Sequence, residues 1–418
     1  MFRHLYSLVH VLALPILAWQ LVRKYRREGH SAEITARLVG QPPQVAPGGL
    51  WIHACSLGEA QVAMTLAQAV TELSPARAIW FTSTTPAGLN RLRDGTSGNS
   101  FAIFPWDLPW VWDTWLSATQ PVACLLIETE LWPNLMAACR RRGIPVLLAN
   151  GRVSTRSMRG YQRWSWLSRP MWEGLSLALM QGSSDRDHAL LLGASPQSAT
   201  VCGSIKLDQV PPDADPTLVS RLQQWASDRP VLALISSHPT EEVEILAALG
   251  DSRDQWAVVI VPRHPIRSAE LAVQLMPPVV RLSDPQLPPD AIVIVDRFGA
   301  IGSVLALTTV ALLGGTWIPH GGQNPIEIAR WRRPMIAGMH VFNFSEICAG
   351  LAEAGGLVQS RYDQLADDLA RVYPEAANRG QAAYDWVDQQ SGATQRQATA
   401  IDQYLLQRDA HAHEGSPL

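Results

Sequence analysis

Lysine is almost absent from this chain of 418 residues. Of its 34 basic residues two are lysines, Lys24 and Lys206, which leaves 32 arginines against 37 acidic residues. The net charge of −3 excludes a globally basic nucleic-acid-binding protein. With 47% hydrophobic and 17% charged residues, the chain is neither disordered nor fibrous. Its length predicts a globular protein of two domains.

Paired cysteines and familiar catalytic motifs are missing as well. The five cysteines are far apart and form no CxxC pair, which argues against a disulfide framework and a cysteine zinc site and points to the reducing cytoplasm. No G-x-x-x-x-G-K-[ST] stretch is present, which argues against a P-loop NTPase. No H-E-x-x-H stretch is present either, and the histidines are scattered, so we expect no metal site.

The N-terminal segment is mostly apolar. Residues 5–22 are broken only by Ser7, His10, Pro15 and Gln20, and a basic run follows at 23–27. A secretory signal carries its charge before the apolar stretch, so this order argues against one. We predict that residues 1–27 form a membrane anchor or an interfacial helix with the basic end on the cytoplasmic side. The alternative is a buried first helix of the domain.

Short apolar runs alternate with helical patterns along the rest of the chain. The runs read as strands lie at 50–54, 78–82, 122–127, 146–149, 177–181, 200–202, 231–235, 257–261, 291–295, 310–313 and 335–337. Strands that alternate with helices form parallel sheets. A proline-rich break at 210–216 separates two series. We therefore predict an α/β protein with two doubly wound domains and a cleft between them, in which ligands bind at the carboxyl ends of the strands. The expected domains are 28–205 and 206–390, followed by a C-terminal helix and frayed tail at 391–418.

Two acidic motifs follow predicted strands of the first domain. In His-Ala-Cys-Ser-Leu-Gly-Glu at 53–59, Ser56 and Glu59 have the spacing of a capping box. Glu59 is also a candidate general base that the helix N-terminus keeps ionised, and Gly58 would let a ligand approach the backbone. In Glu-Thr-Glu-Leu-Trp-Pro-Asn at 128–134, Glu128 and Glu130 lie two residues apart. They suit either a paired-acid glycosidase or a hydrogen-bonding scaffold for an acceptor sugar.

Acidic residues are missing from 140–169, which contains eight arginines. Eight of the 16 tryptophans lie between 106 and 172 and overlap this run. Arginine binds phosphate through two hydrogen bonds, and tryptophan favours the membrane interface. We interpret the cluster as a face for an anionic amphiphile and the membrane. Nucleic acid is the competing ligand, which the N-terminal segment disfavours.

Polar and glycine-rich motifs follow the strands of the second domain. They lie at 236–242, 262–265, 296–302 and 314–327, where a doubly wound sheet binds its ligand. We expect Asn324 to cap a helix whose first residue is Pro325, with Glu327 in its first turn. The glycines before this helix, Gly321 and Gly322, would leave backbone N–H groups free for a phosphate.

Seven motifs in order resemble those of the 3-deoxy-D-manno-octulosonic acid (Kdo) transferases of Gram-negative bacteria, over nearly the whole chain. Five of them are the motifs at 53–59, 128–134, 262–264 (Pro-Arg-His), 320–327 (His-Gly-Gly-x-Asn-Pro-x-Glu) and 203–208 (Gly-x-x-Lys-x-Asp). The other two are Asn-x-Arg-x-Ser at 150–154 and Arg-Ser-x-x-Gly-Tyr at 156–161. The resemblance implies a GT-B glycosyltransferase that moves Kdo from CMP-Kdo to a lipid A precursor at the cytoplasmic side of the inner membrane. It implies inversion, no catalytic metal or other cofactor, and no nucleic acid partner.

The resemblance also implies roles for individual residues. Glu59 becomes the proton acceptor for the attacking sugar hydroxyl. The residues carried over as CMP-binding are Pro262, Arg263, Gly299, Ala300, Ile301, Asn324 and Glu327. Further candidate donor contacts are Ser237, His238, Lys206, Gly321 and Gly322. Candidate acceptor contacts are Ser56, Gly58, Glu128, Glu130, Arg152, Arg156 and Arg159.

The chain departs from the family pattern around the donor. The family usually has an acidic residue at 300, histidine at 323 and asparagine at 204, where this chain has Ala300, Gln323 and Ser204. Pro239 interrupts a motif that usually continues with Gly-Glu-Glu. The alternatives are therefore another GT-B enzyme with a different nucleotide sugar and a non-catalytic lipid A-binding relative.

Overall fold

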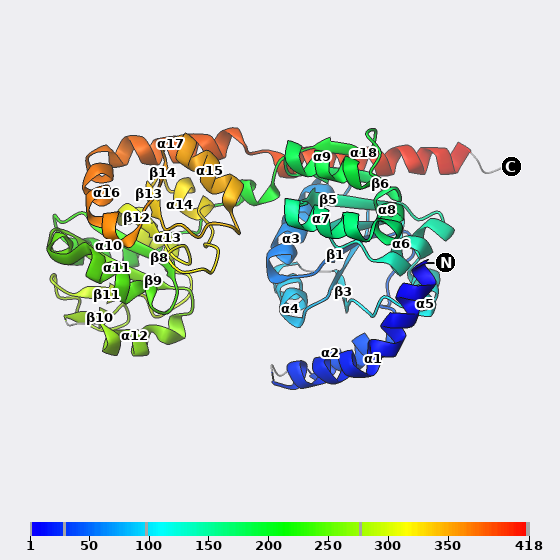
Figure 1. Ribbon diagram of the computed structural model, residues 1–418, viewed down its shortest axis with the longest axis horizontal. Coiled ribbons are helices and arrows are strands. Elements are labelled where there is room, and N and C mark those ends of the chain that lie inside the picture. Colours follow the sequence, from blue (N-terminus) through cyan, green and yellow to red (C-terminus); the bar gives the residue numbers. More distant parts are fainter. Residues whose placement is uncertain (1, 28–30, 97–98, 276–277, 415–418) are drawn as a thin grey trace. The chain divides into compact units, whose positions relative to one another are not determined.

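The computed structural model describes residues 2–27, 31–96, 99–275 and 278–414, in two compact units (Figure 1). Unit 1 comprises Met1–Asp208 and Ser391–Leu418, and unit 2 is Gln209–Gln390. Each unit contains a sheet of seven parallel strands with helices on both faces.

The sheet of unit 1 has the order β3-β2-β1-β4-β5-β6-β7. Its strands are β1 (Leu50–Ala54), β2 (Ile79–Ser83), β3 (Ser100–Ile103), β4 (Ala123–Ile127), β5 (Val146–Gly151), β6 (Leu175–Met180) and β7 (Ala199–Val201). All five residues of β1 are buried, because helices cover both faces of the sheet. In register, Leu50 lies beside Ile79 of β2 and beside Ala123 of β4. The chain order reverses between β1 and β4, where a doubly wound sheet places its ligand site.

The helices of unit 1 form two cores, one on each face of this sheet. They are α1 (Phe2–Arg27), α2 (Ser31–Val39), α3 (Leu57–Leu73), α4 (Pro86–Gly95), α5 (Pro109–Thr119), α6 (Pro133–Arg141), α7 (Thr155–Arg163), α8 (Ser165–Trp172), α9 (Ser183–Leu192), the short 3-10 helix η1 (Ile205–Asp208) and α18 (Ala393–Glu414). On one face, Trp51 packs in a core with residues of α5, α6, α8 and α9. On the other, Leu50 and Ile52 pack in a core with α3 and α18.

The sheet of unit 2 has the order β10-β11-β9-β8-β12-β13-β14. Its strands are β8 (Val231–Ser237), β9 (Ala257–Pro262), β10 (Val279–Arg281), β11 (Ile292–Ile294), β12 (Thr308–Leu313), β13 (Met335–Ala337) and β14 (Leu357–Gln359). Its helices are α10 (Pro216–Ala226), α11 (Glu241–Leu249), η2 (Gly250–Gln255), η3 (Pro265–Arg267), α12 (Ser268–Gln274), α13 (Ile301–Leu307), α14 (Ile326–Arg330), α15 (Ser345–Glu353), η4 (Tyr362–Gln364), α16 (Leu365–Val372), η5 (Tyr373–Glu375) and α17 (Ala376–Gln389).

The units divide at positions that differ from the predicted ones. Residues 206–208 belong to unit 1, because the carboxylate of Asp208 accepts hydrogen bonds from the backbone N–H groups of Gly392 (2.6 Å) and Thr394 (2.5 Å). The segment 391–418 belongs to unit 1 too, since α18 packs on α3. Within the predicted C-terminal helix and frayed tail, the chain is helical as far as Glu414, where α18 ends. Residues 415–418 lie outside the described residues.

Helix α1 lies along the surface of unit 1. Near its start, the Ser7 hydroxyl donates to Asn134 Oδ1 at 3.1 Å. Midway, the His10 ring meets Trp106 edge-on, and near its end the Tyr25 hydroxyl donates to the carbonyl of Thr84 at 3.1 Å. The opposite stripe is apolar and exposed, with Leu5, Leu8, Val9, Leu12, Ile16 and Trp19 each more than half accessible. The alternative of a buried first helix is therefore wrong.

Most of the tryptophans between 106 and 172 lie in or against the core of unit 1. Trp112, Trp115 and Trp172 are buried, and Trp106 and Trp132 pack against the same core. The interpretation of the whole tryptophan cluster as a membrane face is therefore wrong. Trp110 and Trp164 are exposed at 56% and 55% and remain as surface residues.

Candidate active site

Glu59 lies at the carboxyl end of β1, in the first turn of α3. Its Oε2 accepts the Cys55 backbone N–H at 2.7 Å, and its Oε1 accepts the Ser56 hydroxyl at 2.8 Å. The Glu59 N–H returns a bond to Ser56 Oγ at 3.3 Å, which is one half of the predicted capping box. In the other half the Glu59 carboxylate bonds the Cys55 N–H in place of the Ser56 N–H. A Cβ added at Gly58 would meet no atom within 4 Å, so space is open beside the start of this helix. The two interpretations of the motif are compatible, because the capping contacts fix the carboxylate in one position.

The loop after β4 brings two more carboxylates to the same edge of the sheet. Glu128 has a left-handed backbone with φ 63°, which costs energy for a residue other than glycine. Its Oε1 forms an ion pair with Lys206 Nζ at 2.7 Å. Lys206 therefore lies beside the acidic loop of unit 1 and has a carboxylate partner there.

The motifs around Lys206 hold that lysine in place. Asn150, at the end of β5, accepts the Ile205 backbone N–H on its Oδ1 at 3.0 Å. Its own backbone N–H donates to Gln397 Oε1 of α18 at 2.7 Å. Together with the contacts of Asp208, these bonds fix both ends of η1. The Asn-x-Arg-x-Ser and Gly-x-x-Lys-x-Asp motifs therefore act partly as structural supports for the Lys206–Glu128 pair.

Burial raises the pKa of Glu59 to about 7, and the negative charges of Glu128 and Glu130 act in the same direction. The hydrogen bonds from Cys55 and Ser56 oppose this change. The expectation that the helix N-terminus keeps Glu59 ionised is thus only partly right, because desolvation outweighs it. Burial also raises the pKa of Glu130. A carboxyl group that titrates near neutral pH is suited to proton transfer.

Cys55, Glu59 and Glu130 present donor atoms within 4.8 Å of one another, which is close enough to hold a metal ion. Burial and the neighbouring acids raise the pKa of the Cys55 thiol to about 12. A protonated thiol is a poor metal ligand. The Glu59 oxygens are also used by the capping bonds already described.

Of the candidate arginines of the first domain, Arg152 contacts the acidic loop. The Arg152 carbonyl accepts the Thr129 hydroxyl, which joins β5 to the acidic loop. Arg156 and Arg159 are exposed on α7, a helix with no buried residue. Some arginines of the acid-free run 140–169 form ion pairs with acids outside it. Arg141 lies 2.9 Å from Asp113, and Arg169 lies 2.8 Å from Glu173.

Arg263 and Glu327 are electrostatic neighbours in unit 2. Arg263 is exposed just after β9, and its backbone N–H donates to the Ser237 carbonyl at 2.9 Å. Burial raises the pKa of Glu327, while the Asn324 amide and the positive charge of Arg263 lower it. Asn324 donates to Glu327 Oε1 at 3.3 Å. Pro262 is buried at the end of β9 and positions this arginine.

His238 lies against His320, with ring centroids 3.9 Å apart. Burial, together with the positive charges of His320, His264 and Arg263, lowers the pKa of His238 to about 4. Its Nε2 lies 2.8 Å from Gln323 Nε2. His320 was missing from the predicted contacts, although it begins the 320–327 motif. Its pairing with a residue 82 positions earlier is set by the tertiary structure.

Several predicted donor contacts have other partners in the structure. The Ser237 hydroxyl is buried and donates to Glu242 Oε1 at 2.8 Å. The Gly322 N–H donates to the Gly315 carbonyl at 2.7 Å, so the expectation that it is free for phosphate is wrong. Gly321 has φ 102°, and a Cβ there would lie 2.4 Å from Phe342, so it is required for the packing of this loop.

The two helix starts of unit 2 also differ in detail. Helix α14 begins at Ile326 and spans five residues, so Pro325 occupies the capping position that we predicted for Asn324. Asn324 Oδ1 still accepts the Ile326 N–H at 3.1 Å. Before α13, Gly299 has φ 80° and Ala300 is buried, which leaves only backbone atoms of this turn, including those of Ile301, for a ligand.

Comparison with known proteins agrees with this arrangement of motifs. The family model for 3-deoxy-D-manno-octulosonic-acid transferase (kdotransferase) matches residues 26–209. The 3-deoxy-D-manno-octulosonic acid transferase of Bordetella pertussis is 31% identical over 95% of this chain and 99% of its own. The enzyme of that name from Haemophilus influenzae is 31% identical over 86% of this chain and 88% of its own.

The chain belongs to the Kdo transferase family. It is therefore a glycosyltransferase. Among solved structures, a glycosyltransferase from Rickettsia africae aligns with a TM-score of 0.59 at 13% identity, over 87% of this chain and 99% of its own. That likeness shows the fold alone. Together with the two parallel sheets, it confirms the predicted GT-B architecture.

Proposed function

We propose that this protein transfers Kdo from CMP-Kdo to a lipid A precursor, with inversion at the anomeric carbon and without a metal ion. The observation that carries the proposal is the Glu59 carboxyl group. It is fixed by two hydrogen bonds at the end of β1, beside open space at Gly58, and has a pKa of about 7. Such a group can accept a proton at neutral pH.

In the proposed mechanism, Glu59 removes the proton of the acceptor hydroxyl as that oxygen attacks the anomeric carbon of Kdo. The bond from this carbon to the CMP phosphate breaks, and the transition state has oxocarbenium character, as in glycoside hydrolysis. A single displacement by one base inverts the anomeric centre. Glu130 and the Lys206–Glu128 pair shape the electrostatic field around Glu59.

Unit 2 supplies the donor site in this proposal. The exposed guanidinium of Arg263 is suited to the leaving phosphate, since arginine offers paired donors and a fixed charge. Glu327 and Asn324 lie beside it and suit the hydroxyl groups of the ribose. The turn at Gly299–Ile301 contributes backbone groups.

We propose further that α1 lies in the plane of the cytoplasmic leaflet of the inner membrane. The helix is long and apolar enough to span a bilayer, by length and composition. However, Ser7 near its start and Tyr25 near its end both contact unit 1. A helix attached to one domain at both ends presents a single face to lipid, as interfacial helices do. Its exposed leucines form that face.

The test is incubation of the full chain with a CMP-Kdo generating system and a lipid A precursor, followed by mass spectrometry. We expect a product heavier by one or more Kdo units. Glu59→Gln should abolish transfer while binding of CMP to unit 2 remains, measured by calorimetry. Transfer from a UDP-sugar but not from CMP-Kdo, or full transfer by the variant, would contradict the proposal.

A further inference from the structure

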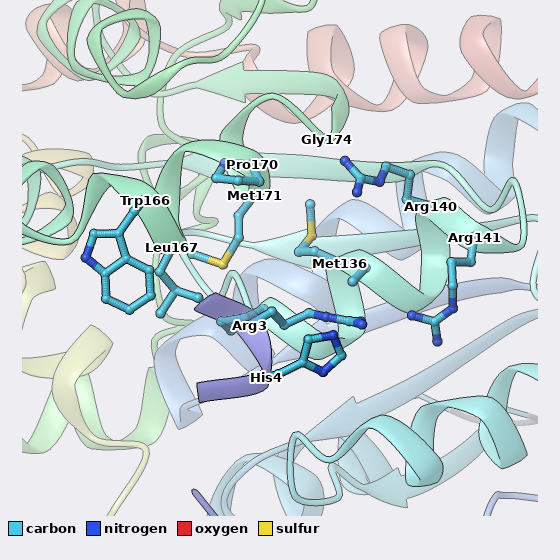
Figure 2. Close-up of a pocket in the computed structure, with 12 residues that line it drawn as sticks. Arg3, His4, Met136, Arg140, Arg141, Trp166, Leu167, Pro170, Met171 and Gly174 are labelled. Carbon is cyan, nitrogen blue, oxygen red and sulfur yellow. The ribbon is translucent and has the colours of Figure 1, made fainter. Parts of the chain in front are cut away.

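A cavity of about 370 Å³ lies where α1, α6 and α8 meet in unit 1 (Figure 2). Arg3 and His4 reach it from α1, and Arg140 and Arg141 reach it from α6. Its remaining lining is largely apolar, and Met136, Leu167 and Met171 are among it. Among the described residues, no acidic side chain lines it. The cavity is therefore cationic on one side and apolar on the other.

Two of the arginines in this cavity, Arg3 and Arg140, form no ion pair among the described residues. Arg3 Nη1 is buried and has no hydrogen-bond partner among the described residues. Within the same described part of the chain, the Arg140 side chain forms no ion pair, whereas Arg141 pairs with Asp113 at 2.9 Å. A buried guanidinium nitrogen without an acceptor costs free energy, and an anion seated in the cavity would supply that acceptor. Guanidinium groups bind phosphate through charge-assisted hydrogen bonds.

A second, mainly apolar groove adjoins the cationic cavity. It is lined by Gly160, Tyr161 and Trp164 of α7 and its end, and it shares Leu167 and Met171 with the first cavity. Trp164 is 55% exposed there. An anion site joined to an apolar groove matches an amphiphile that carries a phosphate and an acyl chain. A free phosphate ion would occupy only the cationic cavity.

We propose that this cavity and groove bind an anionic phospholipid of the membrane on which α1 rests. The phosphate lies between Arg3 and Arg140, and an acyl chain follows Leu167 and Met171 toward Trp164. Neither Glu59 nor Glu128 nor Glu130 lines either part, although the Tyr161 hydroxyl of the groove donates to the Thr129 carbonyl of the acidic loop at 3.3 Å. The inference does not depend on Kdo transfer, since it concerns lipid binding alone.

The first test measures binding of the full chain to phosphatidylcholine vesicles with and without phosphatidylglycerol at physiological ionic strength. The variant Arg3→Gln/Arg140→Gln removes two charges from the cavity. The matched control Arg142→Gln/Arg169→Gln removes two charges that line neither part. General attraction to an anionic surface weakens similarly in both variants. We expect the cavity variant to lose at least about tenfold more affinity than the control for phosphatidylglycerol vesicles. Equal losses would overturn the proposal.

The second test removes the membrane surface. Dihexanoyl-phosphatidylglycerol below its micelle concentration is titrated into the protein, with dihexanoyl-phosphatidylcholine and inorganic phosphate as separate arms. We expect saturable binding of the phosphatidylglycerol that is lost in Arg3→Gln/Arg140→Gln and retained in the control. Equally tight binding of inorganic phosphate, or a higher KM for the lipid A precursor only in the cavity variant, would overturn the assignment to a phospholipid. Unchanged thermal unfolding establishes that the variants are folded.

Discussion

The pKa of Glu59 gives the proposed mechanism a quantitative consequence. If the ionised carboxylate is the base, kcat/KM follows the fraction of Glu59 that has lost its proton. With a pKa of about 7, that fraction is about one tenth at pH 6 and about nine tenths at pH 8. We therefore expect kcat/KM to rise about tenfold between these two pH values. A glutamate with an ordinary pKa would give a flat profile in this range.

The assay is the initial rate of Kdo transfer in detergent between pH 5 and 9, with CMP-Kdo supplied at a constant concentration. Incubation at each pH before assay at pH 7.5 controls for inactivation. The variant Glu130→Gln removes one of the negative charges that raise the pKa of Glu59. The acidic limb of the rate profile, where kcat/KM rises with pH, should therefore move to lower pH. Glu72→Gln, on the same helix but exposed, should leave the limb in place.

Two results would refute the reasoning. One is an acidic limb near pH 4.5, which would show that burial does not raise the pKa of Glu59. The other is a Glu59→Gln variant that keeps most of the activity, since loss of a general base costs about 10²–10⁴ in rate. A limb that is unchanged in Glu130→Gln would contradict the electrostatic contribution of the loop after β4.

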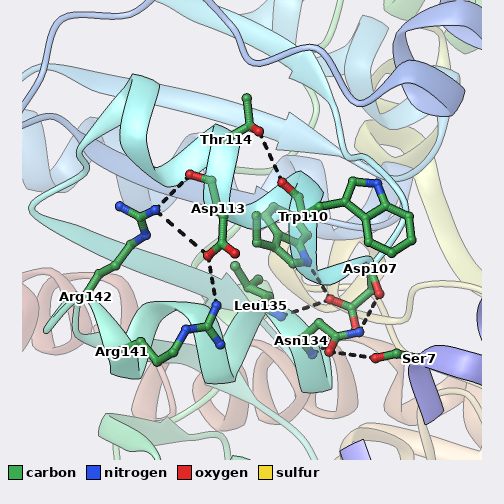
Figure 3. Close-up of polar contacts among 10 residues, drawn as sticks. Ser7, Asp107, Trp110, Asp113, Thr114, Asn134, Leu135, Arg141 and Arg142 are labelled. Atoms are coloured by element: carbon green, nitrogen blue, oxygen red, sulfur yellow. Dashed lines mark hydrogen bonds and ion pairs between the residues drawn. The ribbon is translucent and has the colours of Figure 1, made fainter. Parts of the chain in front are cut away.

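Three further predictions follow from neighbouring contacts. Lys206→Met leaves Glu128 without its cation, so we expect the acidic limb of the rate profile to move to higher pH. Asp107→Ala removes the buried acceptor of the Asn134, Leu135 and Trp112 N–H groups (Figure 3) and should cost about 3 kcal/mol or more in urea unfolding. The exposed Asp113→Ala, its matched control, should cost no more than about 1 kcal/mol. EDTA should leave transfer unchanged, and loss of activity restored by a divalent cation would instead indicate a metal at the Cys55 group.

The alternation of apolar runs and helices was enough to predict both parallel sheets. The central strands are buried on both faces and have long apolar runs, such as 50–54 and 257–261. Three strands, β3, β10 and β14, were not predicted, and they are edge strands of three or four residues. Their short runs are not distinguishable from loop residues, because pairing with an inner strand rather than local pattern makes them strands.

The candidate site was predictable where local chemistry determines it. The cap of α3 by Ser56 follows from the 56–59 spacing and is present, although Glu59 bonds the Cys55 N–H in place of the Ser56 N–H. The raised pKa of Glu59 was not predictable, since it depends on burial and on a loop some 70 residues away. The same holds for the Lys206–Glu128 pair. At 321–322 the glycines suggested a phosphate site, but tertiary packing uses the Gly322 N–H for a bond to Gly315.

The return of the chain to unit 1 through α18 determines the order in which the protein can fold during synthesis. Ala398, Ile401 and Leu405 complete a core of unit 1, and Gln397 holds Asn150. When residues 1–208 have left the ribosome, the helix that covers α3 has therefore not yet been synthesised. Unit 2 is continuous in sequence, so its sheet can form before unit 1 is complete. The apolar surface of α3 stays exposed until the last part of the chain has been synthesised. Chaperone demand should accordingly concentrate on the first unit, and truncation before Ser391 should make it aggregate.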